Sequence, residues 1–200
     1  MSVPETAVDR RLARGVETRR RLAEAMIALL EEGVPQPSAR EIAERAGVSL
    51  RLVFHHFEDM EQVLRAAVAV QVSRHWNRLH PVDPSLPLGE RVERIIRQRE
   101  TLYEAIAPVR RAAARAELES PTIATELSRA RRQLRRGLEA TFEAELHSAS
   151  HDERLDALDV AGSWETWDLL RTRMGVGRAM ARRVVARMMT SLLEDQGGSK

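Results

Sequence analysis

The apolar positions of this chain repeat with helical spacing along most of its length. Residues 18–32 carry apolar side chains in the i, i+3, i+4, i+7, i+8 pattern of an amphipathic helix, at Leu22, Ala25, Met26, Leu29 and Leu30. Gly33 follows them and can cap the C-terminal end of that helix. Helical spacing recurs in the later segments, so we predict an all-α protein of about nine helices.

Residues 38–57 contain two short helical segments joined by a glycine. Ser38 and Glu41 have capping-box spacing and predict the start of the first segment, and Ser49 is expected to cap the second. Gly47 can adopt the positive φ angle that a sharp turn requires. Together with the preceding helix, these segments predict a small core made of Leu22, Met26, Leu29, Ile42, Ala43, Val48, Val53 and Phe57.

This core leaves the outer face of the second short helix in contact with solvent. In a helix-turn-helix, the second helix enters the major groove of DNA and its N-terminal residues reach base edges. Arg51 on that face suits bidentate contact with guanine, and Leu50 or Leu52 suits contact with thymine methyl groups. The alternative is a corner between two helices with no role in nucleic-acid binding. The glycine turn, both caps and the arginines upstream favour DNA binding.

Composition changes this picture mainly through the distribution of charge. The 32 Lys and Arg residues nearly balance the 30 Asp and Glu residues, for a net charge of +2. Residues 9–21, DRRLARGVETRRR, nevertheless hold six arginines against Asp9 and Glu17. This cluster is either a solvated face or a set of phosphate contacts. The residues that we predict to contact DNA are Arg19, Arg20, Ser38, Arg40, Ser49, Leu50, Arg51, Leu52, His55 and His56.

The stretch IAERAGVS at 42–49, followed by HF at 56–57 and an acidic helix start at Asp59, resembles the TetR family of transcriptional regulators. TRRRLAEAMIALLEEG at 18–33 looks like the first helix of that family, and SWETWDLLR at 163–171 with the closing helix looks like its last two. The resemblance is specific over residues 18–70. It implies an all-α dimer with an N-terminal DNA-binding domain and a larger C-terminal domain that binds a small effector. We therefore expect a homodimeric repressor that is released from a palindromic operator by this effector.

Two positions depart from the pattern of the TetR family. The family commonly has tyrosine where this chain has Phe54 and lysine where it has Met60, and both usually contact DNA phosphates. Phe54 has no hydroxyl group and Met60 has no charge, so these contacts cannot be carried over. The arginines of residues 10–21, Ser49 and His55 or His56 are the candidates to replace them.

The expected organisation has four parts. A flexible basic arm occupies residues 1–17, and the helix-turn-helix domain occupies 18–60, with a connecting helix that runs to about residue 79. An effector-binding and dimerisation domain spans residues 80–195, and a tail spans 196–200. Within the larger domain, HPVDPSLPLGE predicts a linker, and Pro108 is expected to break or kink a helix.

A helix expected near residues 152–173 is apolar on two faces, which must both be covered. Together with a last helix near residues 177–193, it could form a four-helix interface in a two-fold dimer. The alternative is that both faces are covered within one chain. The residues predicted for the dimer interface are Leu155, Leu158, Gly162, Leu169, Met180, Val184, Met188 and Leu192.

Arg99 lies at the centre of an otherwise apolar stripe on the helix after the linker. An unpaired arginine is costly to bury, so it should either pair with a carboxylate such as Glu145 or line a cavity and meet a polar or anionic ligand. Ligand sites usually have mostly apolar walls. The residues predicted to bind a ligand are therefore Arg99, Tyr103, Phe142, Trp164 and Trp167.

Several other classes of protein are disfavoured by the sequence. The absence of cysteine excludes disulfides and thiolate chemistry, and no apolar run suggests a signal peptide or a membrane span, so we expect a cytoplasmic protein. His55 and His56 are adjacent and would point about 100° apart on a helix, so we expect no metal and no cofactor. The motifs of common enzymes are missing, so we expect no catalytic residues. The remaining alternative is a helical adaptor that binds only proteins.

Overall fold

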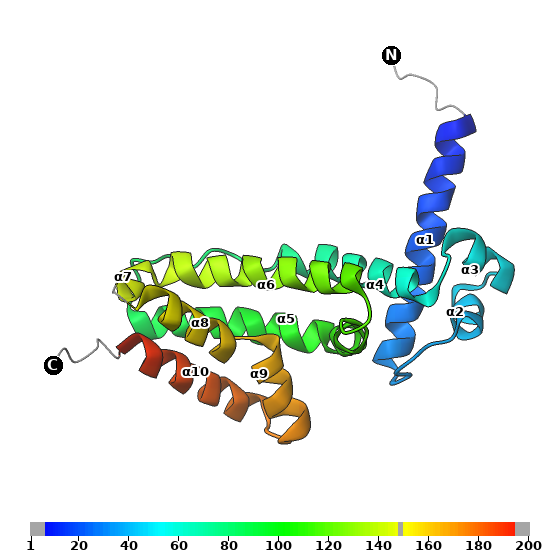
Figure 1. Ribbon diagram of the computed structural model, residues 1–200. Helices are drawn as coiled ribbons and strands as arrows, with labels where there is room; N and C mark the ends of the chain where they lie inside the picture. The colour runs from blue at the N-terminus through cyan, green and yellow to red at the C-terminus, as the bar shows by residue number, and fades with distance from the viewer. Residues whose placement is uncertain (1–6, 148–149, 195–200) are drawn as a thin grey trace, which may run out of the picture. The chain divides into compact units, whose positions relative to one another are not determined.

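The computed structural model describes residues 7–147 and 150–194, and all its regular elements within these ranges are helices (Figure 1). This confirms the all-α prediction. The chain divides into two compact units. The first unit combines the chain up to His75 with Ile106–Ala124, and the second combines Trp76–Ala105 with the chain from Thr125 onward. We expected one boundary between the domains near residue 80. The chain instead crosses from the first unit to the second after His75, returns to the first unit at Ile106, and crosses again after Ala124.

The first unit begins with a long helix, α1, at Ala7–Glu31. Residues 7–17, which we expected to form a flexible arm, are part of this helix. Alanine, arginine, leucine and glutamate are strong helix formers, and the single Gly15 opposes them by only about 1 kcal/mol. Residues 1–6 of the expected arm, and the expected tail at 196–200, lie outside the described residues.

The helix-turn-helix consists of α2 (Ala39–Ala46) and α3 (Leu50–His56). The Ser38 hydroxyl oxygen accepts a hydrogen bond from the Glu41 backbone at 3.3 Å, and the Glu41 carboxylate accepts one from the Ser38 backbone at 2.7 Å. Gly47 ends α2 with a φ angle of +63°, which strains any residue with a side chain. Ser49 caps α3 by accepting from the Leu52 backbone at 3.3 Å. These four sequence predictions are confirmed.

The predicted core of this domain is confirmed except at one residue. Val48 is only half-buried at the turn, whereas the other members are buried. In Figure 1, α2 and α3 lie beside α1. The next helix, α4 (Met60–Trp76), ends before the predicted residue 79, because Asn77 has a low helix propensity and Pro81 disfavours a helical conformation at the preceding residue.

Gln71 is a polar residue on the buried face of α4. Its side chain is 3% exposed, and neither polar atom of its amide has a hydrogen-bond partner among the described residues. Leaving such a group unpaired typically costs about 1–3 kcal/mol. We therefore expect Gln71→Met, which keeps the length of the side chain, to raise the free energy of unfolding by about 1 kcal/mol in urea denaturation.

Gln62→Met is the matched control on the same helix. The Gln62 amide donates to the Glu58 carboxylate at 3.0 Å near the surface, so its replacement should leave stability within about 0.5 kcal/mol of the unchanged protein. A loss of stability in Gln71→Met would contradict the prediction and would show that the amide has a bound partner such as an ordered water.

The second unit is built around two helices that run side by side, α5 (Leu88–Ala116) and α6 (Pro121–Thr141) (Figure 1). The C-terminal part of α5 and the first turn of α6 belong to the first unit. Pro108 lies inside α5 and does not end it. Ser120 precedes α6 and accepts from the Ile123 backbone at 3.1 Å, as its place before Pro121 predicts. The remaining elements are α7 (Glu143–Leu146), α8 (His151–Ala161), α9 (Trp164–Asp168), the π-helical turn η1 (Leu169–Arg173) and α10 (Arg178–Glu194).

The prediction of a single helix over residues 152–173 is wrong. The helix α8 ends before Gly162, and a new helix, α9, begins after Ser163. Ser163 starts α9 by accepting from the Thr166 backbone at 3.1 Å, a local bond that competes with helix continuation. The Gly162 carbonyl, which no longer serves a continuous helix, accepts hydrogen bonds from the side chains of Arg99 and Tyr103 on α5. The break is thus stabilised by a tertiary contact that helical periodicity does not reveal.

Within the described residues, no helix combines the length and the apolar content that crossing a bilayer requires.

Candidate nucleic-acid interface and ligand cavity

The outer face of α3 exposes a mixed apolar and basic surface. Leu50 and Phe54 are both exposed although they are large and apolar, and Arg51 and His55 are exposed beside them. Leu52, which we grouped with them, is only half-buried. Apolar side chains of this kind can contact thymine methyl groups, and an arginine can donate to guanine.

Two exposed arginines of the helix-turn-helix are without a protein partner among the described residues. Arg40 on α2 and Arg51 on α3 form no hydrogen bond or ion pair there. The hydroxyl groups of Ser38 and Ser49, in contrast, cap their helices, as described above. Both arginines can therefore donate to a base or a phosphate without losing a contact within the fold.

Two arginines of α1 hold the ends of the short helices. The Arg19 guanidinium donates to the His56 carbonyl and lies 4.2 Å from the centre of the Phe57 ring. Arg21 donates to the carbonyl of Ala46 at the end of α2. These bonds satisfy carbonyl groups that a helix leaves unpaired at its C-terminus. Arg19, which we predicted to contact DNA, therefore has a structural role in the first unit.

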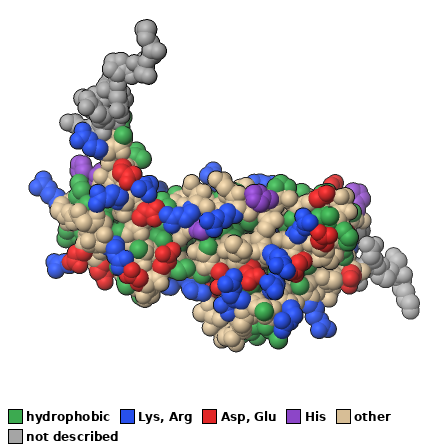
Figure 2. Space-filling view, turned by 180° about the vertical axis from the view of Figure 1, so that it is seen from behind, with side chains coloured by type: hydrophobic (Ala, Val, Ile, Leu, Met, Phe, Trp, Pro, Cys, Tyr) green, Lys and Arg blue, Asp and Glu red, His purple; other side chains and the backbone are tan. Residues whose placement is uncertain are grey.

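Arg20 pairs along its own helix, at 2.8 Å from Glu17 and 3.3 Å from Glu24. Figure 2 shows that basic and acidic side chains are likewise interspersed over this face of the molecule. Exposed pairs contribute only about 0–1 kcal/mol, so Arg20 can exchange its carboxylate partners for a phosphate at little cost. Within the basic cluster, the charge of Arg20 is thus partly neutralised in the free protein.

His56 is placed to act as a neutral hydrogen-bonding group. Burial lowers the pKa of His56, and the positive charges of His55 and Arg19 lower it further, so the neutral imidazole is favoured. The rings of His55 and His56 meet edge to face, with centroids 5.2 Å apart. The described residues include no group of three or more potential ligands that could hold a metal ion.

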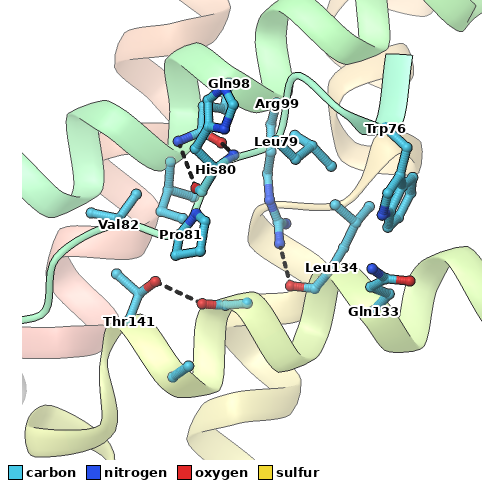
Figure 3. Close-up of a pocket in the computed structure, with 13 residues that line it drawn as sticks. Trp76, Leu79, His80, Pro81, Val82, Gln98, Arg99, Gln133, Leu134 and Thr141 are labelled. Carbon is cyan, nitrogen blue, oxygen red and sulfur yellow. Dashed lines mark hydrogen bonds between the residues drawn. The ribbon is translucent and has the colours of Figure 1, made fainter. Parts of the chain in front are cut away.

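A cavity of about 270 Å³ lies in the second unit (Figure 3). It is bounded by the last residue of α4, the loop that follows, α5 and α6. The loop is the proline-rich segment that we predicted only as a linker. The residues that line the cavity are Trp76, Leu79, His80, Pro81, Val82, Ile95, Gln98, Arg99, Gln133, Leu134, Gly137, Ala140 and Thr141.

Arg99 lines this cavity, as the second of the two alternatives requires, and its contact with a polar or anionic ligand stays a prediction. Its guanidinium donates to the carbonyl of Gly162 and, at 3.0 Å, to the carbonyl of Leu134. The first alternative, a pair with Glu145, is wrong because Glu145 pairs with Arg91. Hydrogen bonds from Arg91 also hold the pKa of the Glu145 carboxyl below its ordinary value.

The structure does not place the other four predicted ligand residues on the cavity walls. Tyr103 donates to the Gly162 carbonyl at 2.9 Å, and the Trp167 indole donates to the Glu104 carboxylate at 3.0 Å. Phe142 is fully buried, and so is most of Trp164. Trp76, which was not predicted, lines the cavity instead; an aromatic residue at the end of a helix that enters a proline-rich loop is the sequence signal for it.

The predicted dimer residues differ in how far they are buried within the subunit. Leu155, Leu158 and Gly162 are buried within the subunit and cannot form an interface without unfolding it, so their assignment is wrong. Leu169, Met180 and Met188 are exposed, and Val184 and Leu192 are half-buried. Val160 of α8, which was not among the predicted dimer residues, is also exposed. The large apolar side chains that are exposed on the described residues of α8, η1 and α10 are Val160, Leu169, Met180 and Met188.

Comparisons with known proteins agree with this geometry. Residues 22–67 match the family model of bacterial regulatory proteins of the tetR family. The fold is similar to that of a transcriptional regulator from Rhodococcus sp. Rha1, with a TM-score of 0.71 and 21% sequence identity over 88% of this chain and 96% of that chain. No curated protein matches the chain. The family match covers the helix-turn-helix with parts of α1 and α4, and the structural likeness extends the shared fold into the second unit.

Proposed function

We propose, from the premise that this chain is a helix-turn-helix transcriptional regulator of the tetR type, that it binds a palindromic operator as a homodimer, represses transcription there, and is released by a small-molecule effector. DNA binding is supported above all by the outer face of α3, where Leu50, Arg51 and Phe54 are exposed. Val53 and Phe57 are buried on its inner side. The capped turn at Gly47 sets α3 against α2, so this face is presented as one rigid surface.

A homodimer is supported by the apolar surface of α8, η1 and α10. Val160, Leu169, Met180 and Met188 are exposed there, and a dimer interface over these helices would remove them from water. A two-fold dimer would use the same patch on both subunits. It would also provide two copies of α3 for half-sites about 34–36 Å apart, which is why we propose a palindromic operator.

An effector is supported by the cavity of the second unit. Trp76 lines the cavity and is also the last residue of α4, the helix that follows α3 in the chain. A ligand beside Trp76 therefore touches the end of a helix that begins next to the DNA-reading element in sequence. Such a ligand acts as a switch only if it prefers the conformation that does not bind DNA, and a coupling of about 1–3 kcal/mol is typical.

The experiment that tests DNA reading is Arg51→Ala, measured on a site selected from random duplex DNA. Because Arg51 has donors free for a base, its loss should weaken binding to the preferred site by about 1–3 kcal/mol and relax the preference at one base pair in each half-site. Binding to unrelated DNA should weaken less. Both affinities are measured by fluorescence anisotropy at one fixed salt concentration.

Arg132→Ala is the charge-matched control, because Arg132 is an exposed arginine of α6 in the second unit. It should leave both affinities unchanged. Equal losses on the preferred site and on unrelated DNA in Arg51→Ala would show that Arg51 contacts a phosphate. Failure of the unchanged protein to retain any DNA at low salt would refute the proposed function and favour a protein adaptor.

A further inference from the structure

Arg99 is a buried cation that contacts no carboxylate of the described residues. Its side chain is 5% exposed, and its hydrogen-bond partners among the described residues are the backbone carbonyls of Gly162 and Leu134. Arg91 on the same helix is buried to a similar degree but pairs with Glu145. Burying a charge without a counter-ion is costly, so a ligand that supplies a negative charge to Arg99 would remove an existing penalty.

Asp159 is near enough to Arg99 for their charges to interact, but it forms its ion pair with Arg135. Asp159 lies 3.9 Å from the guanidinium of Arg135, which is also 2.6 Å from Asp156. Burial raises the pKa of Asp159, although the positive charges of Arg99 and Arg135 oppose this effect. Asp159 therefore does not take the place of a counter-ion in contact with Arg99.

The surroundings hold the Arg99 guanidinium in one orientation. A Cβ atom at Gly162 would lie 2.5 Å from Nη1 of Arg99, so the glycine allows the guanidinium to approach the backbone. The bonds to Gly162 and Leu134 use two N–H groups, and a guanidinium has further donors in the same plane. Figure 3 shows the side chain of Arg99 crossing the cavity, with Trp76 on one side and Pro81 on the other.

The rest of the cavity offers apolar contact more than hydrogen bonding. The side-chain amide of Gln98 is hydrogen-bonded to the backbone of His80: its oxygen accepts from the His80 N–H at 2.9 Å, and its nitrogen donates to the His80 carbonyl at 3.1 Å. Thr141 donates its hydroxyl to the Gly137 carbonyl at 2.7 Å. The apolar residues that line the cavity include Trp76, Val82 and Ile95. His80 and Gln133 are the other polar residues of the lining, and the remaining residues apart from Arg99 are apolar or glycine. A ligand that fits is therefore largely apolar, with its charged group directed at Arg99.

We propose that this cavity binds a small monocarboxylate with an apolar body, whose carboxylate accepts hydrogen bonds from Arg99. The proposal rests on the effector site proposed above and gives the chemical class of its ligand. One guanidinium matches one carboxylate in charge and in planar geometry, whereas a dianion would require a second cation. The volume of about 270 Å³ lies near the lower end of ordinary ligand pockets and selects a small body, such as a single aromatic ring or a short aliphatic chain.

The test is a titration of the full-length, DNA-free protein with benzoate, phenylacetate and hexanoate, each compared with its neutral amide. Binding is followed by isothermal calorimetry and by tryptophan fluorescence. At least one acid should bind, and it should bind at least about tenfold more tightly than its amide, because only the acid supplies the missing charge. Hexylamine should not bind, since it would bring a second positive charge to Arg99.

Two variants test whether the tighter binding of the acid takes place in this cavity. Arg99→Met keeps the apolar length of the side chain and should reduce the affinity for the acid to that of the amide. Gly137→Leu should abolish binding of both, because a side chain at this lining position enters space with no atom within 4 Å. Gly137 lies within α6, so its replacement also favours the helix and keeps the test valid even if Arg99→Met fails to fold.

The outcomes separate this proposal from the proposed function. Equal affinity for acid and amide, or no binding of any acid, would overturn the monocarboxylate assignment even if the protein binds its operator. Retention of acid binding in Gly137→Leu would also overturn it, because the ligand would then occupy another site. An acid that binds as expected but leaves operator affinity unchanged would support the ligand class and refute its role as an effector.

Discussion

Met189→Glu is expected to unfold the second unit, whereas Met188→Glu is expected to leave it folded and to separate the proposed dimer. The two methionines are neighbours on α10, but Met189 is 0% exposed and Met188 is 38% exposed. Ala181, Val185 and Leu193 share the buried face of Met189. A glutamate in that face would bury an unpaired charge and lose apolar packing, which should cost about 4 kcal/mol or more.

Met188→Glu tests the proposed homodimer directly. If Met188 lies in a two-fold interface, each dimer gains two buried charges, and the dissociation constant should rise by at least about 100-fold. Sedimentation velocity gives the association state, and circular dichroism with urea denaturation gives the stability of each variant. Met188→Leu is the control, since it keeps an apolar side chain and should remain dimeric.

A dimeric Met188→Glu protein at micromolar concentration would place the interface elsewhere. A native-like, stable Met189→Glu protein would contradict the packing of α10. Leu158 should behave like Met189, because it is also buried within the subunit. Its replacement by glutamate should therefore reduce folding and not merely dissociate the dimer.

Phe57→Ala is expected to destabilise the DNA-binding domain by about 3–5 kcal/mol, which is a large part of the stability of an ordinary domain. The Phe57 ring is 1% exposed and belongs to the core shared by α1, α2 and α3. It also lies 4.2 Å beneath the Arg19 guanidinium, which donates to the end of α3. Loss of the ring therefore leaves a cavity and removes a contact that holds the DNA-reading helix in place. Urea denaturation followed by circular dichroism measures the change.

Phe54→Ala is the matched control, because the same residue type stands three positions earlier on α3 with 54% exposure. Its loss should change the free energy of unfolding by no more than about 0.5 kcal/mol. If the exposed ring contacts DNA, the same variant should nevertheless bind the selected site more weakly. A similar loss of stability in both variants would contradict the assignment of inner and outer faces to α3.

Local sequence was sufficient for the helix-turn-helix. Ser38, Gly47 and Ser49 act through contacts with residues only a few positions away, and each has the role that its spacing predicts. The inward side of α3 also follows from the spacing of Val53, within the helix, and Phe57, the residue directly after it, because both are buried. Helix caps, turns and the buried face of an isolated amphipathic helix depend on short-range geometry, so the sequence determined them.

The arginines of the chain needed the tertiary structure, because a guanidinium can pair with any acceptor within reach of its long side chain. Nothing in the spacing distinguishes Arg91 from Arg99 as the partner of Glu145, which lies far away in the sequence. Folding brings Arg91 to Glu145 and brings Arg99 to the carbonyl of Gly162. In the same way, Arg19 and Arg21 bind helix ends and are not simply free for DNA.

The apolar faces of the C-terminal helices were decided only by packing. Periodicity showed that the segment after residue 152 is apolar on two sides, but it could not show which side the rest of the chain covers. Folding buries Leu158 and leaves Val160 exposed, and the break at Gly162 changes the direction in which the following residues face. The sequence by itself therefore determined the helical class and the DNA-reading unit, because both follow from local geometry. The tertiary structure decided the cavity, the partner of Arg99 and the exposed face, because each depends on contacts between distant segments.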